Sequence, residues 1–143
     1  MARSYRLTPL RRLANSMMRL LLRLGLAPRT TMLLTVRGRR SGTPRSTPVT
    51  LVEESGQRWL VAPYGSVGWV HNTRAAGQME LSRGRRSKTV LVQEFAPRAA
   101  APILKAYVER VPITRPYFDA ASDAPLAAFA AEAPKHPVFQ VVP

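Results

Sequence analysis

From residue 31 onward, short apolar and β-branched segments alternate with turns marked by glycine, proline and small polar residues. Six of these segments have the length and composition of β-strands, and most are close enough in sequence to pair as hairpins. A series of hairpins favours an antiparallel barrel over a doubly wound parallel sheet. The expected strands are residues 31–37, 47–53, 58–62, 78–83, 87–95 and 138–142.

Apolar residues at helical spacing occur before the strands and between them. Because the chain has 143 residues, the size of one domain, we predict a single α+β, mainly β domain over residues 1–143. Its N-terminal helix falls within residues 1–28 and its barrel within residues 29–143. The expected helices are residues 7–24, 69–76 and 97–111, with a further short helix inside the proline- and alanine-rich segment 112–137.

The chain is strongly basic, with 22 Lys and Arg residues against 8 Asp and Glu residues and a net charge of +14. Eleven arginines and no acid lie in residues 1–52. Arginine binds phosphate and carboxylate through two parallel hydrogen bonds, although a GC-rich coding bias produces the same preference. Phosphates, polycarboxylates, nucleic acid and anionic lipid are therefore the partner classes to consider.

The chain contains no cysteine and two histidines, His71 and His136. Disulfides, thiol nucleophiles, iron–sulfur clusters and cysteine-ligated zinc are excluded, and two histidines argue against a histidine-rich metal site. We expect no bound metal. The sequence also shows no Ser/His/Asp arrangement and no pair of acids placed for glycoside hydrolysis.

The expected helix at residues 7–24 is amphipathic. Thr8 and Pro9 are suited to begin it, and Gly25 and Pro28 to end it. Its arginines interrupt the apolar run too early for a membrane span or a secretory signal. Packing on its own domain or a partner subunit, an anionic membrane surface, and an organelle transit peptide remain as interpretations. The apolar stripe comprises Leu7, Leu10, Ala14, Met17, Leu21 and Leu24, and the opposite face carries Arg12, Arg19 and Arg23.

Residues 38–48, GRRSGTPRSTP, combine two glycines and three arginines with hydroxyl side chains that include Ser41, Ser46 and Thr47. Glycines let backbone amides converge in a concave turn, and arginines and hydroxyls add donors, which suits a phosphate or a string of carboxylates. The segment matches neither the P-loop nor the dinucleotide-binding motif. A solvated hairpin tip with incidental arginines is the alternative.

Residues 62–72, APYGSVGWVHN, place two glycines and two aromatic residues before a helix. Small residues let a flat ring system approach the backbone, so a planar cofactor is expected here. Tyr64 and Trp69 have core or rim packing as their alternative role. We expect His71 to be a hydrogen-bonded structural residue and His136, beside two prolines, to be a loop residue.

Residues 33–77 and 137–143 resemble the deazaflavin-dependent nitroreductase family of actinobacteria and their relatives, in which a split β-barrel binds coenzyme F420. The resemblance joins a GR[KR][ST]Gx-PR-x-x-P turn to a later glycine loop, a Trp and a helix Asn. It implies a six-stranded antiparallel split β-barrel. It further implies that the coenzyme's phosphate and oligoglutamate tail contact Arg39, Arg40, Ser41 and Arg45. The deazaflavin then lies along Thr47, Pro48 and Val49, and the pocket is completed by Ala62, Pro63, Tyr64, Gly65, Gly68, Trp69 and Asn72.

The implied activity is hydride transfer from the reduced deazaflavin to a quinone, an activated alkene or a nitroaromatic. Tyr64, Trp69 and Tyr117 are the candidates on the substrate side, and no residue is assigned as catalytic. The loop between Tyr64 and Trp69 is shorter than in nitroimidazole-reducing members, so the acceptor is left open.

Several alternatives accompany this interpretation. FMN is the less favoured cofactor, since the arginine-rich turn suits a longer polyanion, and a heme-binding barrel is disfavoured on the same ground. A non-catalytic F420 carrier at the membrane surface is the alternative function. A nucleic-acid binder is disfavoured because no recognition motif is present. We expect a cytoplasmic protein, which would be peripheral on the inner face of the membrane if the helix at residues 7–24 binds lipid. A homodimer is a further expectation.

Overall fold

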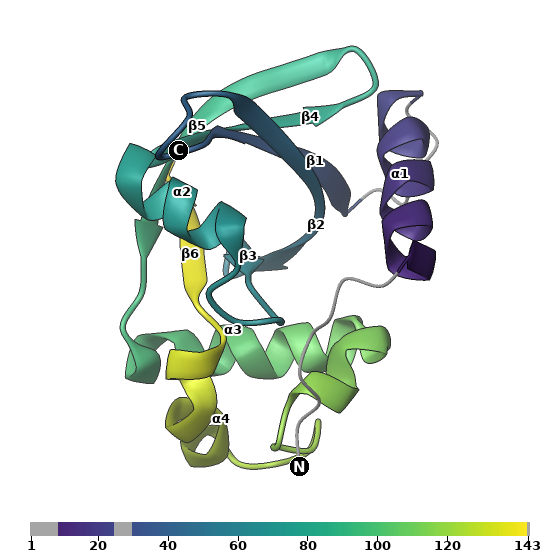
Figure 1. Ribbon diagram of the computed structural model, residues 1–143. Coiled ribbons are helices and arrows are strands. Elements are labelled where there is room, and N and C mark those ends of the chain that lie inside the picture. Colours follow the sequence, from purple (N-terminus) through teal and green to yellow (C-terminus); the bar gives the residue numbers. More distant parts are fainter. Residues whose placement is uncertain (1–8, 25–29, 143) are drawn as a thin grey trace.

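A computed structural model describes residues 9–24 and 30–142 and shows a six-stranded antiparallel barrel (Figure 1). The strands close in the order β1-β2-β3-β6-β5-β4, which confirms the predicted antiparallel barrel. The strands are β1 Thr31–Arg37, β2 Pro44–Glu54, β3 Gln57–Val61, β4 Gln78–Arg83, β5 Arg86–Glu94 and β6 Val138–Val142.

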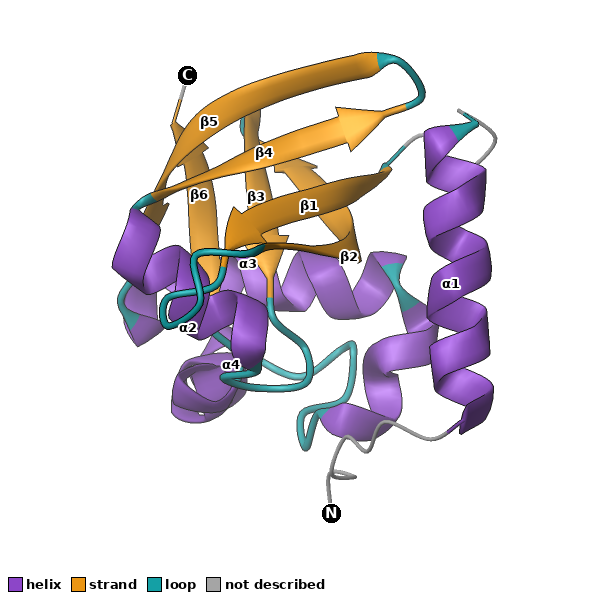
Figure 2. Ribbon diagram, turned by 45° about the horizontal axis from the view of Figure 1, so that its top comes forward, coloured by secondary structure: helices purple, strands orange, loops and turns teal. Residues whose placement is uncertain are grey.

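Helices lie beside the barrel and across one of its ends. α1 stands alone along one side, next to β1 and β2, while α3 and α4 lie together below the barrel (Figures 1 and 2). Two short 3-10 helices, η1 and η2, precede and follow α4 within the segment predicted as a loop around a short helix. The helices are α1 Pro9–Arg23, α2 Gly68–Ala76, α3 Pro97–Arg110, η1 Pro112–Tyr117, α4 Leu126–Glu132 and η2 Ala133–Lys135.

Two hydrophobic clusters stabilise this arrangement, and β3 contributes to both. Leu60 points into the barrel interior, where it packs with residues such as Leu34 and Phe139. Its neighbours Trp59 and Val61 point the other way, into a cluster that includes residues of α3 and α4. Because side chains alternate across a strand, one five-residue strand joins the barrel to its helical end.

β2 begins at Pro44, three residues before the predicted strand start. The predicted boundary at residue 47 is wrong because β1 offers pairing partners as far as Arg37, which lies opposite Pro44. Pro44 needs no ladder donor at the first position of a strand. The turn between β1 and β2 is therefore short, and Arg45 and Ser46 lie on a strand.

α1 packs on its own barrel, through Met18 and Leu21 against Leu33 of β1. The predicted apolar stripe is divided: Leu21 lies inward, whereas Leu10 and Met17 are 76% and 58% exposed. No helix of residues 9–24 and 30–142 is both long and apolar enough to cross a bilayer. The predicted stripe member Leu7 and the predicted caps Thr8, Gly25 and Pro28 lie outside the described residues.

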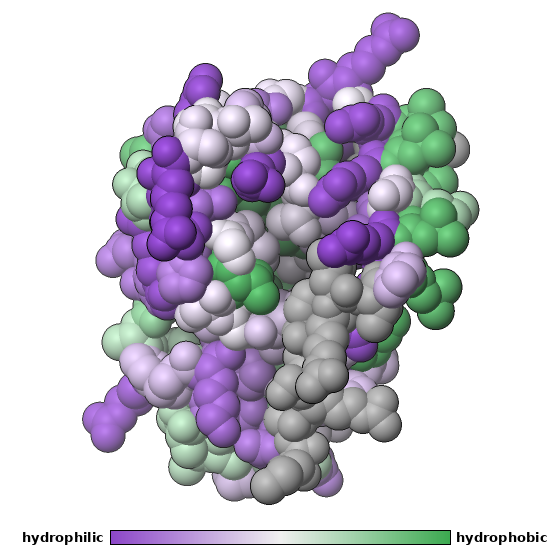
Figure 3. Space-filling model, in the orientation of Figure 1, coloured by the Kyte–Doolittle hydropathy of each residue, from purple (hydrophilic) through white to green (hydrophobic). Residues whose placement is uncertain are grey.

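The outward side of α1 carries a row of exposed apolar side chains, which we call the apolar row. Hydrophobic atoms gather along the outer edge of the molecule where α1 lies, with hydrophilic atoms next to them (Figure 3). The apolar row consists of Leu10, Leu13, Met17, Leu20 and Leu24.

Candidate active site

A pocket of about 510 Å³ lies between β2, the segment that joins β3 to α2, and η1. Its volume is in the range of about 300–1,000 Å³ that is usual for small-molecule sites. Nine of the predicted cofactor-binding residues line it. They are Arg45, Thr47, Pro48, Val49, Pro63, Tyr64, Gly68, Trp69 and Asn72.

The other five predicted residues do not line this pocket. Arg39, Arg40 and Ser41 form the turn that precedes β2, next to Arg45 in the chain. Ala62 is 1% exposed and belongs to the barrel core. Gly65, with a φ of 90°, lies in the bend after β3, where the left-handed backbone favours glycine.

The turn before β2 is built on two glycines. The amide of Gly38 donates to the Thr43 carbonyl at 2.9 Å, and the amide of Gly42 donates to the Gly38 carbonyl at 2.8 Å. A Cβ at Gly38 would lie 2.8 Å from Ser41 Oγ and 3.4 Å from the Thr43 oxygen. The amides of Ser41 and its neighbour Arg40 donate to no backbone carbonyl of the described residues. The turn therefore presents donors as a concave anion site requires.

Asn72 ties this turn to α2. Its Oδ1 accepts hydrogen bonds from the Arg39 amide at 3.0 Å and from Arg39 Nη1 at 2.9 Å. Asn72 is only 4% exposed, so the bonds hold the turn against the first part of α2. Arg39 is thus engaged in positioning the turn, although its side chain is exposed like those of Arg40 and Arg45.

The aromatic candidates lie at different depths. Tyr64 and Trp69 line the pocket, while Tyr117 lies behind Tyr64 with the two rings edge to face at 4.8 Å. Tyr117 is 8% exposed, and its hydroxyl accepts a hydrogen bond from Arg11 of α1. Tyr117 therefore supports the pocket wall and links it to the N-terminal helix.

Ten further residues line the pocket, and those with polar groups that the sequence did not indicate include Asn15 and Arg19 of α1, Tyr107 of α3 and Thr114 of η1. Burial, with a smaller contribution from Tyr64, raises the pKa of Tyr107 far above its ordinary value. The phenol therefore keeps its proton and is able to donate a hydrogen bond. No local sequence pattern indicates that Asn15, Tyr107 or Thr114 lines a pocket. For Arg19, the available signal was an arginine within an otherwise apolar helix.

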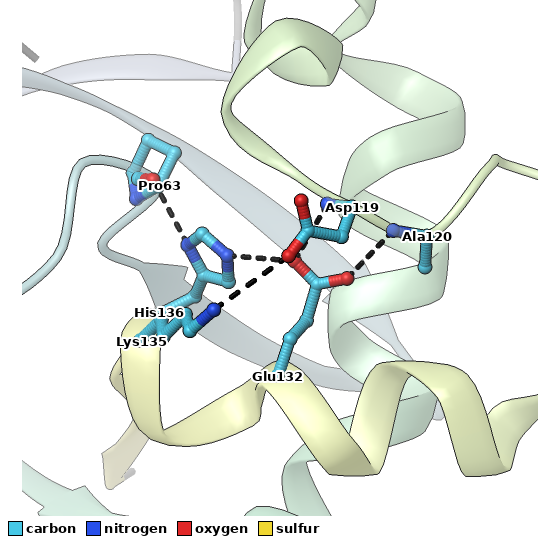
Figure 4. Close-up of polar contacts among 6 residues, drawn as sticks. All are labelled: Pro63, Asp119, Ala120, Glu132, Lys135 and His136. Atoms are coloured by element: carbon cyan, nitrogen blue, oxygen red, sulfur yellow. Dashed lines mark hydrogen bonds and ion pairs between the residues drawn. The ribbon is translucent and has the colours of Figure 1, made fainter. Parts of the chain in front are cut away.

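His136 is a buried polar residue rather than only a loop residue (Figure 4). Its Nδ1 lies 2.9 Å from the Pro63 carbonyl and its Nε2 lies 2.9 Å from Glu132 Oε1. His71, expected to have the structural role, is exposed on α2. The expected roles of the two histidines are therefore reversed. The spacing of Glu132 and His136, one helical turn apart, was the available signal.

Glu132 also binds backbone on the far side of the histidine. Its two oxygens accept the amides of Asp119 and Ala120 at 3.1 Å and 2.7 Å, and Lys135 pairs with Asp119 at 3.6 Å (Figure 4). The pair thus joins α4 and the segment after η1 to Pro63, in the segment between β3 and α2 that we call the pocket loop (residues 62–67). It positions the loop without lining the pocket.

Solved structures with this architecture define the class of the protein. A structure described as a domain-swapped dimer is 22% identical and covers 94% of this chain and 100% of its own, with a TM-score of 0.57. A putative pyridoxamine 5'-phosphate oxidase from Listeria innocua is 13% identical and covers 87% of this chain and 90% of its own, with a TM-score of 0.52. The fold is a split β-barrel of the pyridoxamine 5'-phosphate oxidase type, as predicted.

Within this class the family is defined by sequence. The model of the F420H(2)-dependent quinone reductase family matches residues 11–124, and the chain belongs to this family. The protein is a reductase that uses coenzyme F420, which confirms the predicted family and cofactor. An F420-H2 dependent reductase (FDR-A) is 24% identical and covers 80% of this chain and 95% of its own, with a TM-score of 0.54. No curated protein sequence matches the chain.

Proposed function

We propose that the protein transfers a hydride from reduced coenzyme F420 to a quinone bound in the same pocket. The observation that carries the proposal is the lining of the pocket, to which β2, the loop before α2, α1, α3 and η1 all contribute. Two flat reactants need such a site, where they are held in contact and water is kept from between them. The family description favours a quinone over the alkene and nitroaromatic alternatives.

The residues present fit both ends of the coenzyme. Thr47, Pro48 and Val49 offer a strand surface with little side-chain bulk for the deazaflavin, and Gly68 and Trp69 face the same pocket. When bound, the reduced coenzyme supplies the hydride. Among the described residues, no carboxylate lines the pocket to oppose an anionic ligand.

The tail of the coenzyme is assigned to the turn before β2. Arg40 and Arg45 are exposed cations, and the amides of Arg40 and Ser41 complete the donor set. Arg39 acts through Asn72, which keeps the turn in place. These four residues are the predicted tail-binding set, with positioning of the turn added to the role of Arg39.

Acceptor reduction needs little from the protein beyond orientation and exclusion of water. Tyr64 and Trp69 flank the site, and Tyr117 supports Tyr64 from behind. Tyr107, which retains its proton, is one of the hydrogen-bond donors among the residues that line the pocket.

The proposed function is tested by titrating the protein with F420 and with FMN while coenzyme fluorescence is followed. The complex with reduced F420 is then mixed with menadione, and the return of oxidised F420 absorbance is recorded. Saturable binding of F420 in preference to FMN, with protein-dependent reoxidation, supports a quinone reductase. Binding without reoxidation indicates the alternative, a carrier, and failure to bind F420 overturns both.

For the location of the protein, we propose attachment to an anionic membrane surface on the cytoplasmic side through α1. The apolar row faces away from the barrel, and Arg12 and Arg23 lie beside it on the same helix. Apolar side chains enter the lipid boundary while arginines bind phosphate headgroups. A second copy of the chain is the other occupant of this surface, and the structural neighbour described as a domain-swapped dimer supports it.

A further inference from the structure

α1 turns one arginine toward the pocket. Arg19 lines the pocket together with Asn15, which lies one helical turn earlier. The Nε of Arg19 is buried and has no hydrogen-bond partner among the described residues. A buried donor on a charged group is unfavourable unless an acceptor is supplied. The structure therefore leaves one guanidinium donor at the pocket wall without an acceptor.

Within residues 9–24 and 30–142, no carboxylate pairs with this guanidinium. The ion pairs among the described residues involve Arg74, Arg110, Lys135 and His136, and none involves Arg19. No Asp or Glu of the described residues lines the pocket. The acceptor for Arg19 is therefore expected to come from a ligand.

Arg19 is also separate from the turn assigned to the coenzyme tail. Its neighbours Met18 and Leu21 pack on Leu33, near the start of β1, whereas the turn begins at Gly38 after the strand ends. Leu33 and Gly38 are about 16 Å apart along β1 at about 3.3 Å per residue, while Arg45, the tail residue on β2, lines the pocket together with Arg19. Arg19 thus supplies a second positive site, on the α1 side of the pocket.

We propose that Arg19 binds a carbonyl oxygen of the quinone acceptor and stabilises the negative charge that forms there during reduction. The inference rests on the proposed function and adds the residue that recognises the acceptor. Hydride transfer breaks a C–H bond of the reduced coenzyme and forms an O–H bond at one carbonyl oxygen of the quinone; the electron pair then passes through the ring to the opposite oxygen, which gives a quinol anion. A proton from solvent then completes the quinol. A guanidinium at that oxygen binds the charged product of hydride transfer more strongly than the neutral quinone.

Asn15 is the neutral polar neighbour of this site. Its amide lies on the same side of the pocket, so it is available to orient the acceptor but carries no charge. We therefore assign the charge-dependent part of acceptor binding to Arg19, since Arg45, the other charged residue of the pocket, is assigned to the coenzyme tail.

The test uses two variants at this position and a matched control. Arg19→Gln removes the charge, and Arg19→Lys keeps the charge but removes the Nε donor and the forked geometry. Arg98→Gln removes one exposed arginine at the start of α3; Arg98 does not line the pocket, and Tyr107, the pocket residue of the same helix, lies nine residues later. Thermal unfolding of all three establishes that each is folded. If Arg19→Gln does not fold, Arg19→Lys alone carries the test.

The ligand used to measure binding is 2-hydroxy-1,4-naphthoquinone, which is an anion at neutral pH. Its binding is followed in the absence of coenzyme through quenching of the fluorescence of Trp69, which lines the pocket. Arg19→Gln should raise its Kd by roughly tenfold or more, as expected for one charge-assisted hydrogen bond, and Arg19→Lys by a smaller factor. Arg98→Gln should leave it unchanged. An unchanged Kd in Arg19→Gln, or in Arg19→Lys where only that variant folds, overturns the inference.

Two further measurements separate this inference from the proposed function. F420 affinity should change less than about twofold in Arg19→Gln, whereas kcat with menadione should fall about 10- to 100-fold because the charged transition state loses its partner. An equal loss of F420 affinity would assign Arg19 to the coenzyme and overturn the inference. If the wild-type protein binds the naphthoquinone through Arg19 but does not reoxidise F420, the proposed function fails and the acceptor site stands.

Discussion

His136 Nε2 and Glu132 Oε1 lie 2.9 Å apart, and both side chains are almost fully buried. A carbonyl oxygen accepts only, so His136 Nδ1 must carry a proton to bind Pro63. The contact with Glu132 requires a second proton between the two groups, so the pair is neutral as a unit. Phe118 stacks on the imidazole at 3.9 Å. This relationship sets where the pocket loop begins.

Removal of the imidazole should therefore destabilise the protein. His136→Ala leaves Glu132 buried without its partner, and we expect a loss of about 3–5 kcal/mol in the free energy of unfolding. Denaturant unfolding followed by tryptophan fluorescence measures it. The matched control is His71→Ala, which removes an exposed histidine and should change stability by less than about 0.5 kcal/mol. Equal effects of the two substitutions would show that the buried pair has no special role.

Arg40 in the turn and Arg45 at the start of β2 should decide affinity for the tail of the coenzyme. Arg40→Ala and Arg45→Ala should each weaken F420 binding about tenfold or more, since a charge-assisted hydrogen bond contributes about 1.5–3 kcal/mol. Fluorescence titration with F420, and with the deazaflavin nucleoside that lacks the phosphate and glutamates, measures this. Only the full coenzyme should lose affinity. An equal loss for both ligands would place these arginines at the ring instead.

Asn72→Ala should act on the same turn indirectly. The Arg39 amide and guanidinium lose their common acceptor, so the turn is no longer held against α2. We expect F420 affinity to fall and the penalty of Arg39→Ala to disappear in the Asn72→Ala background, because the two residues act as a unit. A double-mutant cycle on F420 binding measures the coupling. Additive losses would mean that Arg39 contacts the coenzyme directly.

Gly38→Ala should destabilise the turn by about 1–3 kcal/mol, because the added methyl overlaps Ser41 Oγ and crowds the Thr43 carbonyl. Ser41→Ala in the same chain removes the closest of these atoms. The double variant is therefore expected to be more stable than the sum of the single effects predicts, as measured by thermal unfolding. Strict additivity would show that the turn does not have the tight geometry described.

Polar substitutions in the apolar row should weaken membrane attachment without loss of stability. Leu13 and Leu20 are 59% and 57% exposed, so Leu13→Gln with Leu20→Gln removes little buried surface. Co-sedimentation of this variant with phosphatidylglycerol vesicles should be lower than that of the wild-type protein. Vesicles of neutral lipid should bind both proteins weakly. Leu126→Gln, at an exposed leucine of α4, is the control. If vesicle binding persists while sedimentation velocity shows a dimer becoming a monomer, the row is an interface between two copies.

Local pattern was sufficient for the number of strands and for the antiparallel barrel, although it placed the start of β2 three residues late. β1 and β4 begin and end where the alternation of apolar residues and turn signals placed them. Gly38 and Gly42 indicated a tight turn, because the backbone of such a turn restricts which residue types its positions accept. These features depend on residues that are close in the chain. The sequence therefore predicts them, because short-range sterics and hydrogen bonding select the residue types found there.

Tertiary structure alone decided which distant groups meet. His136 binds a carbonyl 73 residues away, and Asn72 receives an arginine 33 residues away. The sequence showed an amphipathic α1, but only packing on Leu33 determined that Arg19 faces the pocket and the apolar row faces out. Helical periodicity defines faces without stating which one a partner covers, because that choice depends on the shape of the surface against which the helix packs.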